Sequence, residues 1–431
     1  MKIMVVGGGG REHAIIKKLK ESPAAGQIYA LPGNGGIAAD AVCVPIAATA
    51  LDEIVGFAVR ESIDFAVVAP DDPLVMGLVD LLSEKGIPCF GPTKAAAAIE
   101  GSKSFAKGLM EKYGIPTAAC RVFDRYEEAL DYVRGVDRYP TVIKADGLAL
   151  GKGVVIAPDR ETAESALRDM MLGGRFGKSG ETVVIEEYLE GPEVSVLAFT
   201  DGETVVPMVS SMDHKRALDG DKGPNTGGMG TVAPNPFYTD EVAETCMQRI
   251  FLPTVRAMKA EGRPFRGCLY FGLMLTKDGP KVIEYNCRFG DPETQVVLPL
   301  LESDLLTVMQ ACASGALTAE QVKFRSGAAA CVILASGGYP VAYEKGKPIT
   351  GLVDGQLPDE PNVTVYHSGT AITEDGQLVT NGGRVLGVTA TGDTLGQAVE
   401  RAYAAVDRVK FQNAFCRRDI GQKALQRKGR S

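Results

Sequence analysis

Residues 1–101 alternate short apolar runs with helix-forming stretches, and glycine or proline closes each run. The runs are IMVVG, QIYALPG, FAVVAP and IPCFGP, at residues 3–7, 27–33, 65–70 and 87–92. Strands separated by helices form a parallel sheet, because a crossover connection is needed to start each strand from the same edge. We therefore expect a parallel α/β domain whose loops meet at the carboxyl ends of its strands.

The rest of the chain has a different pattern. A length of 431 residues exceeds what one core usually serves, so about three domains are expected, with boundaries at 1–101, 102–322 and 323–431. The middle part contains a hairpin pattern at 268–286 and amphipathic helices at 124–135, 159–172 and 239–260. The last part is rich in strands and ends in a helix around 394–409 and a basic tail with Lys423 and Arg427, expected to be solvated.

Composition excludes several classes of protein. The net charge of −8 argues against a general nucleic-acid binder, because binding by counterion release needs a basic surface. The apolar runs, such as AAACVILA at 328–335, are far shorter than the roughly 20 residues of a membrane span. The nine cysteines form no C-x-x-C pair, and the N-terminus enters a strand without a secretory h-region. We expect a cytoplasmic protein with no membrane or nucleic-acid partner.

A glycine-rich turn follows the first strand. VVGGGGREHA places Gly7 to Gly10 and Arg11 between strand and helix, where backbone N–H groups and the helix dipole attract phosphate. The G-x-G-x-x-G spacing of a dinucleotide site fails here, which leaves a small phosphate-ester cradle or a tight turn. The second loop, 32–36, would lie on the same side of the sheet and bring Asn34 to that pocket.

Lysines and glycines then recur in a pattern suited to a triphosphate. Lys103 stands at a predicted helix start, and Lys144 ends an apolar strand, where a buried ammonium needs an anion. Gly151, Lys152 and Gly153 lie in a hairpin loop, 147–153, whose amides could close over phosphates; two surface lysines on an ordinary hairpin are the alternative.

Two further stretches carry polar groups. The strand TVVIEEYLEG ends in Glu186, Glu187 and Tyr188, which resembles a hinge that reads an adenine edge, and Glu193 could accept hydrogen bonds from a ribose. A solvated strand end is the alternative for the two acids. The segment 210–230 is polar, glycine-rich and long for a connection, which favours a substrate-handling loop over a disordered linker.

The stretch KVIEYNCRFGDPETQ, 281–295, ends a strand in dense charge. Residues i and i+2 of a strand share a face, so Glu284 and Asn286 point together while Tyr285 and Cys287 point away. A carboxylate and an amide oxygen on one face suit Mg²⁺. Arg288 could pair with a carboxylate, and Asp291 and Glu293 either orient Arg288 or contact substrate.

In this order, these motifs resemble those of the ATP-grasp superfamily and, within it, the phosphoribosylamine–glycine ligase family. The resemblance runs along essentially the whole chain. The motifs that carry it are GGREHA, PGN-x-G, EGSK, VIKADGLA-x-GKGV, DHKR, GPNTGGMG, E-x-NCRFGDPETQ, H-x-GT, NGGRVL and CR-x-DIG. The most specific are GPNTGGMG and NCRFGDPETQ.

The resemblance implies an α/β and α+β multidomain protein. Its parts would be an N-terminal parallel α/β (pre-ATP-grasp) domain, a central ATP-grasp fold with a small lid at about 122–192, and a mixed α/β C-terminal domain. It implies ATP-dependent ligation of glycine to 5-phosphoribosylamine in purine biosynthesis, with Mg²⁺ or Mn²⁺, and we take a monomer as the expected state. Another ATP-grasp enzyme such as a carboxylase, a nucleotide-dependent oxidoreductase and a non-catalytic ATP sensor are the alternatives.

The residue patterns and the resemblance together predict the site. The ATP-binding residues are Lys103, Lys144, Gly151, Lys152, Gly153, Glu186, Glu187, Tyr188 and Glu193. The substrate-binding residues are Gly9, Gly10, Arg11, Asn34, Asp213, Lys215, Asn225, Arg288 and Asp291. The metal ligands are Glu284 and Asn286, and the catalytic residues are Arg288, Asp213 and Lys144.

The chain also departs from the family pattern. It has Asp71 where related ligases commonly have Glu in GPE-x-PL, which keeps the charge but shortens its reach. The strand CLYFGLML carries no acidic residue, so the predicted metal site depends on Glu284 and Asn286 alone.

Overall fold

The computed structural model describes residues 1–148, 153–174 and 177–428. The N-terminal region is a five-stranded parallel sheet in the order β3-β2-β1-β4-β5. Its strands are β1 Ile3–Gly7, β2 Ile28–Pro32, β3 Val42–Cys43, β4 Phe65–Val68 and β5 Cys89–Phe90. Its helices are α1 Gly10–Leu19, α2 Leu51–Arg60, α3 Asp71–Met76 and α4 Leu78–Glu84. The predicted parallel α/β fold is confirmed; β3 was not predicted, because two residues are too short to show a period.

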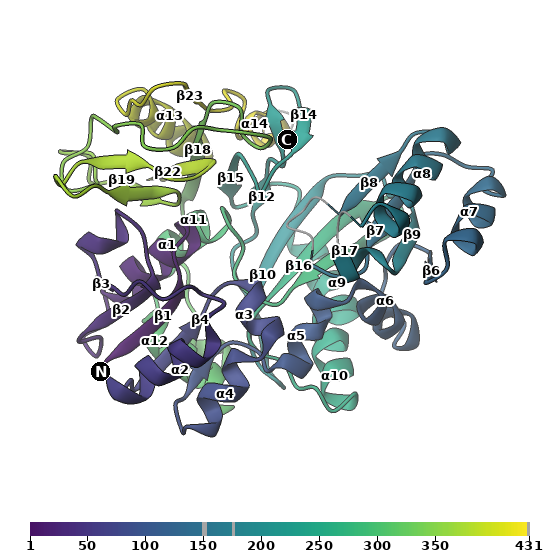
Figure 1. The fold of residues 1–431 in the computed structure, drawn as a ribbon, viewed down its shortest axis with the longest axis horizontal. Helices are drawn as coiled ribbons and strands as arrows, with labels where there is room; N and C mark the ends of the chain where they lie inside the picture. The colour runs from purple at the N-terminus through teal and green to yellow at the C-terminus, as the bar shows by residue number, and fades with distance from the viewer. Residues whose placement is uncertain (149–152, 175–176, 429–431) are drawn as a thin grey trace.

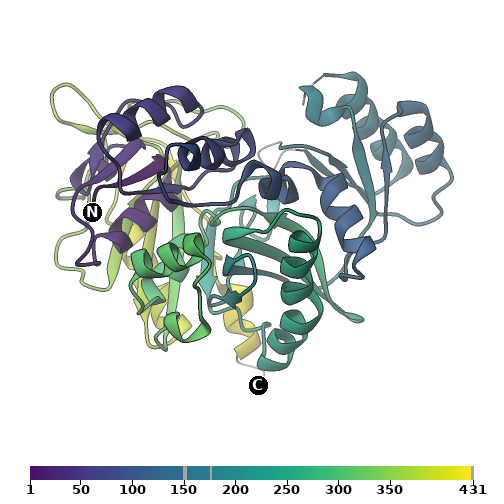
Figure 2. The ribbon, with the colours of Figure 1, turned by 90° about the horizontal axis from the view of Figure 1, so that it is seen from below.

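The central region contains two antiparallel sheets. The first, in the order β6-β9-β7-β8, carries α7 Tyr126–Arg134 and α8 Arg160–Leu167 and forms the lobe that projects from the body (Figure 1, Figure 2). Its strands are β6 Cys120–Phe123, β7 Thr141–Ala145, β8 Val154–Ala157 and β9 Val183–Glu187. The predicted hairpin of β7 and β8 is confirmed by their antiparallel pairing.

The second central sheet has the order β11-β10-β16-β17. Its strands are β10 Glu193–Asp201, β11 Val205–Pro207, β16 Arg266–Thr276 and β17 Gly279–Asn286. The N-terminal region ends in helix α5 Lys94–Gly101, and the other helices of the central region are α6 Lys103–Lys112, α9 Asp240–Cys246, α10 Leu252–Ala260, α11 Thr294–Val297 and α12 Leu305–Ser314. The predicted helices at 159–172 and 239–260 are confirmed, each with π-helical residues, Arg168–Leu172 and Met247–Phe251.

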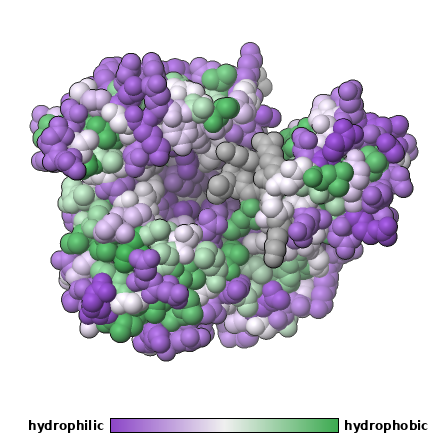
Figure 3. Space-filling model, in the orientation of Figure 1, coloured by the Kyte–Doolittle hydropathy of each residue, from purple (hydrophilic) through white to green (hydrophobic). Residues whose placement is uncertain are grey.

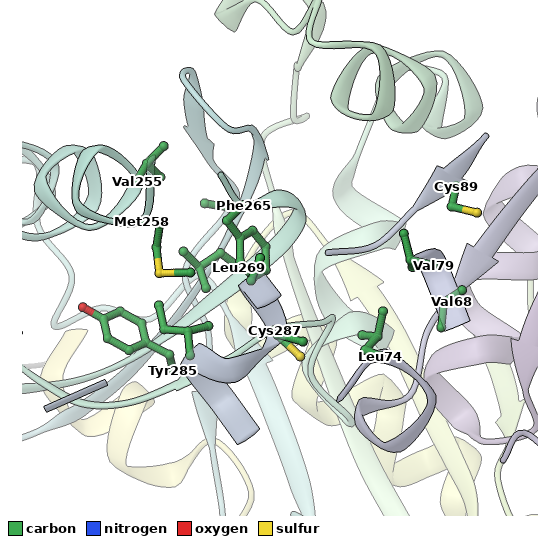
Figure 4. Packing of buried hydrophobic residues seen from close by; sticks show 14 of the residues in the cluster. Val68, Leu74, Val79, Cys89, Val255, Met258, Phe265, Leu269, Tyr285 and Cys287 are labelled. Carbon is green, nitrogen blue, oxygen red and sulfur yellow. The ribbon is translucent and has the colours of Figure 1, made fainter. Parts of the chain in front are cut away.

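One hydrophobic cluster joins the N-terminal sheet to the second central sheet. Val68 and Leu74 from the N-terminal region lie in the same cluster as Leu269, Tyr285 and Cys287 (Figure 4). Tyr285 and Cys287 are buried in this cluster, so the alternate residues of β17, Glu284 and Asn286, point away from it. The core therefore sets the direction of the predicted metal ligands.

The C-terminal sheet takes two strands from the middle of the chain. Its order is β12-β15-β18-β22-β19, with β23 beside β18. The strands are β12 Met212–Asp213, β15 Gly230–Ala233, β18 Ala328–Ser336, β19 Val363–His367, β22 Arg384–Gly392 and β23 Ala414–Phe415. Segment 210–230, predicted as an irregular loop, thus begins and ends in this sheet. Between those strands it forms a hairpin of β13 Arg216–Leu218 and β14 Lys222–Asn225.

The last described helix, α14 Gln422–Lys428, packs on the body through Ala424, while the side chains of Lys423 and Arg427 are exposed, as the prediction of a solvated tail expected. The remaining elements of the C-terminal region are β20 Thr370–Ile372, β21 Leu378–Thr380, α13 Leu395–Val406 and α14 Gln422–Lys428. Lys423 forms an ion pair with Asp221, and the Arg427 guanidinium lies 4.9 Å from the centre of the Phe237 ring. Ala424 on the same helix is fully buried. Among the described residues, no helix is both long and apolar enough to cross a membrane.

Asn34 joins the N-terminal region to the C-terminal region. Its side-chain Nδ2 donates to the carbonyl oxygens of Gly8 at 3.0 Å and His367 at 2.7 Å. Its Oδ1 accepts hydrogen bonds from the N–H groups of Gly36 and Ile37, both at 2.9 Å. The side-chain amide of Asn34 is thus used on backbone partners from two regions of the chain.

Replacing Asn34 with Ala should lower stability more than substrate affinity. The change leaves backbone groups at the contact without their partners, which costs about 1–3 kcal/mol. We expect a lower midpoint of thermal unfolding, while Asn362→Ala at an exposed position leaves the midpoint unchanged. A wild-type midpoint for Asn34→Ala together with a raised KM for substrate would instead favour the predicted binding role.

Candidate active site

A single cavity of about 1250 Å³ brings most of the predicted residues together. Figure 3 shows a hollow with a hydrophilic floor between the body and the lobe. The predicted residues that line it are Arg11, Lys103, Lys144, Gly153, Glu186, Glu187, Tyr188, Glu193, Asp213, Lys215, Asn225, Glu284, Asn286, Arg288 and Asp291. Gly9, Gly10 and Asn34 are described residues that do not line it, and Gly151 and Lys152 lie outside the described residues.

One buried carboxylate holds two lysines at the lobe side of the cavity. Glu186 Oε1 lies 3.1 Å from the Lys144 ammonium, and Glu186 Oε2 lies 3.2 Å from that of Lys107. All three side chains are at most 5% exposed, so each charge needs the others. Burial lowers the pKa of Lys107 even though Glu186 opposes the shift. The anion that the buried Lys144 needs is therefore the side chain of Glu186, which was expected at an adenine hinge.

Lys107 was missed by sequence reasoning, although a signal exists. It follows Lys103 by four residues, so both lie on one face of α6. Ser102 caps this helix by accepting the N–H of Phe105, which fixes where the face begins. Lys103 Nζ donates to the carbonyl of Gly147 at 2.9 Å and thus reaches the start of the predicted phosphate loop.

The hinge acids have partners of their own. Glu187 accepts the N–H of Ala119 at 3.0 Å and lies 3.2 Å from the Lys281 ammonium, so it ties β9 to its neighbours. Glu193 lies 3.1 Å from the Lys215 ammonium, and this contact raises the pKa of Lys215 well above its ordinary value. Lys215 also lies 3.7 Å from Glu284.

Glu284 and Asn286 share one face of β17 as predicted. Although burial favours the neutral acid, Lys215, Lys144 and the other nearby cations hold the pKa of Glu284 below its ordinary value. Both residues line the cavity, whereas Cys287 is fully buried. An ionised carboxylate beside an amide oxygen is a donor set that fits Mg²⁺, which takes few protein ligands and keeps waters or phosphates. Within the described ranges, no group of three or more His, Cys, Asp or Glu residues could hold a metal.

Arg288 pairs with acids from the N-terminal part of the chain. Its Nη2 lies 3.0 Å from Glu100 Oε1 and 3.8 Å from Asp71 Oδ2, and donates to Asn286 Oδ1 at 3.3 Å. The predicted carboxylate partner is thus Glu100, in the motif EGSK, with Asp71 beside it. Asp291 and Glu293, which could have oriented Arg288, contact other residues instead.

Asp291 is held by an arginine of the C-terminal region. Arg384 Nη2 lies 3.3 Å from Asp291 Oδ2, and Arg384 Nη1 donates to the carbonyls of Asp291 at 2.7 Å and Gly227 at 2.8 Å. Arg384 lines the cavity but was missed by sequence reasoning. Arg384 is the arginine of the motif NGGRVL, which could have pointed to it, but the same motif could equally have formed a packing turn.

Two further acids, the buried Glu293 and the half-buried Asp213, line the cavity. Burial, and then the charge of Glu293, raise the pKa of Asp213 well above its ordinary value. Glu293 accepts a hydrogen bond from the Tyr270 hydroxyl at 3.1 Å. Burial also raises the pKa of Glu293. Asp213 and Glu293 are therefore places where the cavity can accept a positively charged group or a proton.

The glycine-rich turn is partly filled by its own helix. Glu12 Oε2 accepts the N–H of Gly9 at 2.6 Å, and Glu12 Oε1 lies 2.6 Å from Arg11 Nε. Arg11 also donates to the carbonyl of Phe289 at 3.1 Å. A Cβ at Gly10 would lie 2.6 Å from both Gln295 Nε2 and Ser368 Oγ, so this glycine allows close packing. Of this turn, Arg11 faces the cavity, while the Gly9 amide is used within the protein.

Comparison with known proteins agrees with this architecture. Residues 101–294 match the family "Phosphoribosylglycinamide synthetase, ATP-grasp (A) domain". The biotin carboxylase domain of the Hydrogenobacter thermophilus 2-oxoglutarate carboxylase has the same fold, with a TM-score of 0.74 and 18% sequence identity. The match covers 96% of this chain and 91% of that one. The fold and the site therefore define an ATP-grasp protein. Residues 1–100 and 329–423 match the N and C domains of the same synthetase. The chain belongs to the phosphoribosylamine–glycine ligase family.

Individual relatives cover the full length. The phosphoribosylamine–glycine ligase of Allochromatium vinosum is 49% identical over 430 residues, which is 99% of each chain. That of Caldanaerobacter subterraneus subsp. tengcongensis is 48% identical over 97% of this chain and 99% of its own. The crystal structure of the Thermotoga maritima phosphoribosylamine–glycine ligase has a TM-score of 0.84 and 36% identity, and the match covers 97% of this chain and 100% of that one.

Acid should destabilise the protein through His214. Its Nε2 accepts the N–H of Gly421 at 3.2 Å and its Nδ1 lies 3.1 Å from the carbonyl of Gly230, so the ring is neutral with the proton on Nδ1. Burial, and then Arg417, lower the pKa of His214 to about 4, against the opposing charges of Asp419 and Asp221. The unfolded chain, with a pKa of about 6.5, therefore binds a proton that the folded chain excludes, and this stability is lost as the pH falls from about 6.5 through about 4.

Between pH 7.5 and 4, wild type should lose up to about 3 kcal/mol more unfolding free energy than His214→Gln, which cannot titrate. Denaturant unfolding at a series of pH values measures this difference. Parallel pH curves for the two proteins would contradict it.

Proposed function

We propose that this protein catalyses the ATP-dependent ligation of glycine to 5-phosphoribosylamine, giving glycinamide ribonucleotide, ADP and phosphate. The observation that carries the proposal is the meeting of two sets of charges at the end of β17. Lys103 and Lys144 approach Glu284 from one side, and Arg288 continues the chain on the other. A nucleotide held by the lysines and an acid held near the arginine would meet at this strand.

The chemistry needs an activated acid, because a free carboxylate is a poor electrophile. We infer that a glycine carboxylate oxygen attacks the γ-phosphorus of ATP, the bond to the β-phosphate oxygen breaks, and ADP leaves. The amine of phosphoribosylamine then attacks the carbonyl carbon of glycyl phosphate, phosphate leaves, and the amine gives up a proton. No protein nucleophile is required, so the protein would act by positioning and by stabilising charge.

Each part of the cavity suits one task in this reaction. Lys144 and Lys103 would face the phosphates, and Lys107 with Glu186 would hold Lys144 in place. Asp213 would accept hydrogen bonds from the glycine ammonium, while Arg288 would face the carboxyl group being phosphorylated. The cavity residue Arg11 would contact the phosphate of phosphoribosylamine.

Glu284 and Asn286 would hold a Mg²⁺ or Mn²⁺ ion. When bound there, such an ion would offset the charge of the ATP phosphates as charge moves to the leaving group. The low pKa of Glu284 supports this assignment because the carboxylate stays ionised. The nine free cysteines suit a reducing compartment, and we propose that the protein works in the cytoplasm as a monomer on small molecules.

The function is tested by ADP release with glycine and freshly made phosphoribosylamine, each omitted in turn. We expect ADP release to require glycine and glycinamide ribonucleotide to form only when both substrates are present. A parallel reaction with bicarbonate tests the carboxylase alternative. ADP release that follows bicarbonate and ignores glycine would overturn the proposal.

Lys144→Ala should lower kcat on the order of 10²–10³-fold, as for other preorganised charge stabilisers. The variant also leaves Glu186 with only one of its two lysines. Steady-state ADP release measures the loss, and Lys85→Ala at an exposed position serves as the matched control. Near-normal turnover by Lys144→Ala would remove Lys144 from the mechanism.

Glu284→Gln should keep the shape of the side chain but remove its anion. We expect most activity to be lost and the Mg²⁺ concentration for half-maximal rate to rise, because one charged ligand is gone. A Mg²⁺ titration of the rate measures this shift, with Glu203→Gln at an exposed position as control. An unchanged Mg²⁺ dependence would count against Glu284 as a ligand.

A further inference from the structure

The segment 416–423, which we call the C-terminal clasp, lies against the hairpin of β13 and β14. Its central residue, Arg417, is only 1% exposed, which is unusual for an arginine outside an active site. Arg417 does not line the cavity, and the reaction proposed above gives it no task. Its burial therefore needs another explanation.

Arg417 forms a fork with a neighbouring acid and reaches across to the hairpin. Its Nε and Nη2 donate to Asp419 Oδ1 at 2.7 Å and Asp419 Oδ2 at 2.8 Å. Nη2 also lies 2.9 Å from Asp221, and Nη1 donates to the carbonyl of Arg216 at 3.1 Å. One guanidinium thus contacts strand β13 and the turn of the hairpin, and it also orders the clasp itself.

Other groups of the clasp bind the hairpin turn. The N–H of Gly220 donates to Asp419 Oδ2 at 2.8 Å, and the N–H of Arg418 donates to Asp219 Oδ1 at 2.7 Å. At the other side, the N–H of Gly421 donates to His214 Nε2 at 3.2 Å. The clasp therefore holds the hairpin at its turn and at its base.

The hairpin depends on such contacts because it is weak by itself. Its two strands pair only at Arg216 with Asn225 and Leu218 with Lys222, with an irregularity between them. An isolated two-stranded hairpin is marginally stable at best in water. Yet its base carries Asp213, Lys215 and Asn225 into the cavity.

We propose that the C-terminal clasp positions the substrate-facing residues of segment 213–226, and that Arg417 is the positioning residue at its centre. The proposal rests on the proposed function for the identity of the substrate, glycine, which Asp213 would face. The nucleotide side of the cavity is built from β7, β9 and α6, none of which the clasp contacts through the hydrogen bonds described above. Lys215 of this segment pairs with Glu193 at 3.1 Å, so loss of the clasp should affect glycine strongly and ATP less.

The first test is kinetic and uses the full-length protein. Arg417→Met keeps an unbranched apolar stem but removes the fork, and Arg417→Lys keeps the charge without the fork. We expect kcat/KM for glycine to fall on the order of 10²-fold in Arg417→Met, since misplaced groups outside the chemistry can cost this much. The value should fall less in Arg417→Lys, and in both variants the dissociation constant of ATP should change by much less than kcat/KM for glycine.

The matched control is Arg408→Met. Arg408 also makes an ion pair in the C-terminal region, with Glu360 at 2.7 Å, and donates to the carbonyl of Pro358. Its side-chain hydrogen bonds among the described residues go to residues 358 and 360, and not to the hairpin. Arg408→Met should retain wild-type kinetics for glycine and ATP alike.

The second test is amide hydrogen exchange, which needs no turnover. Arg417→Met and Asp419→Asn should speed exchange across 215–226 while β7 and β9 keep wild-type protection. If Arg417→Met speeds exchange in both regions, that variant is generally unfolded. The milder changes Arg417→Lys and Asp419→Asn then decide whether the clasp orders the hairpin. Unchanged exchange across 215–226 in all these variants, or equal losses for glycine and ATP, would overturn the proposal.

The two tests separate this inference from the proposed function. If wild type shows no glycine-dependent ADP release, the proposed function fails while the exchange measurement still decides whether the clasp orders the hairpin. If wild type is active and the variants keep its glycine KM and its exchange rates, the clasp fails and the function stands.

Discussion

The position of the whole site depends on the charge of Arg288, whose side chain is largely buried. Its guanidinium joins α5 through Glu100, the start of α3 through Asp71, and β17 through Asn286. A buried cation is stable only when it is paired and hydrogen-bonded, so separating any of these elements would leave charge uncompensated. The N-terminal sheet and the second central sheet are thus held in the one arrangement in which these groups meet. The cavity is the space that this arrangement leaves.

Local patterns predicted much of this, and distant contacts did not. The alternation along β17 was visible because residues two apart share a face, which placed Glu284 correctly opposite Cys287. The start of α6 at Lys103 was also predicted from local sequence, without its cap. The pairing of Arg288 with Glu100 joins residues 188 apart in sequence, and that of Arg384 with the carbonyl of Gly227 joins residues 157 apart. No periodicity in a single sequence carries such information.

The fold of segment 210–230 could not be predicted for a similar reason. Its polar, glycine-rich composition indicated a loop, and composition alone could not reveal that β12 and β15 complete a sheet with β18, about a hundred residues later. Strands of two to four residues are too short to show alternation, and their pairing is set by the partner. The consequence is functional: the C-terminal region is built into the cavity wall, through this sheet and through Arg384.

Several cations that line the cavity are already paired with carboxylates in the protein alone. Lys144 is paired with Glu186, Lys215 with Glu193, Arg288 with Glu100 and Arg384 with Asp291. This pairing keeps the side chains ordered before substrate arrives, which is what preorganised stabilisation of charge requires. It also means that a triphosphate, on the proposed function, would enter a site with few uncompensated cations and would lie near the ionised Glu284. Two like charges about 4 Å apart repel by about 1–4 kcal/mol in solvent-exposed to half-buried surroundings. On the proposed function, a divalent cation held by Glu284 would offset this repulsion, so the proposal of an acidic ligand at position 284 and that of a metal rest on the same charge balance.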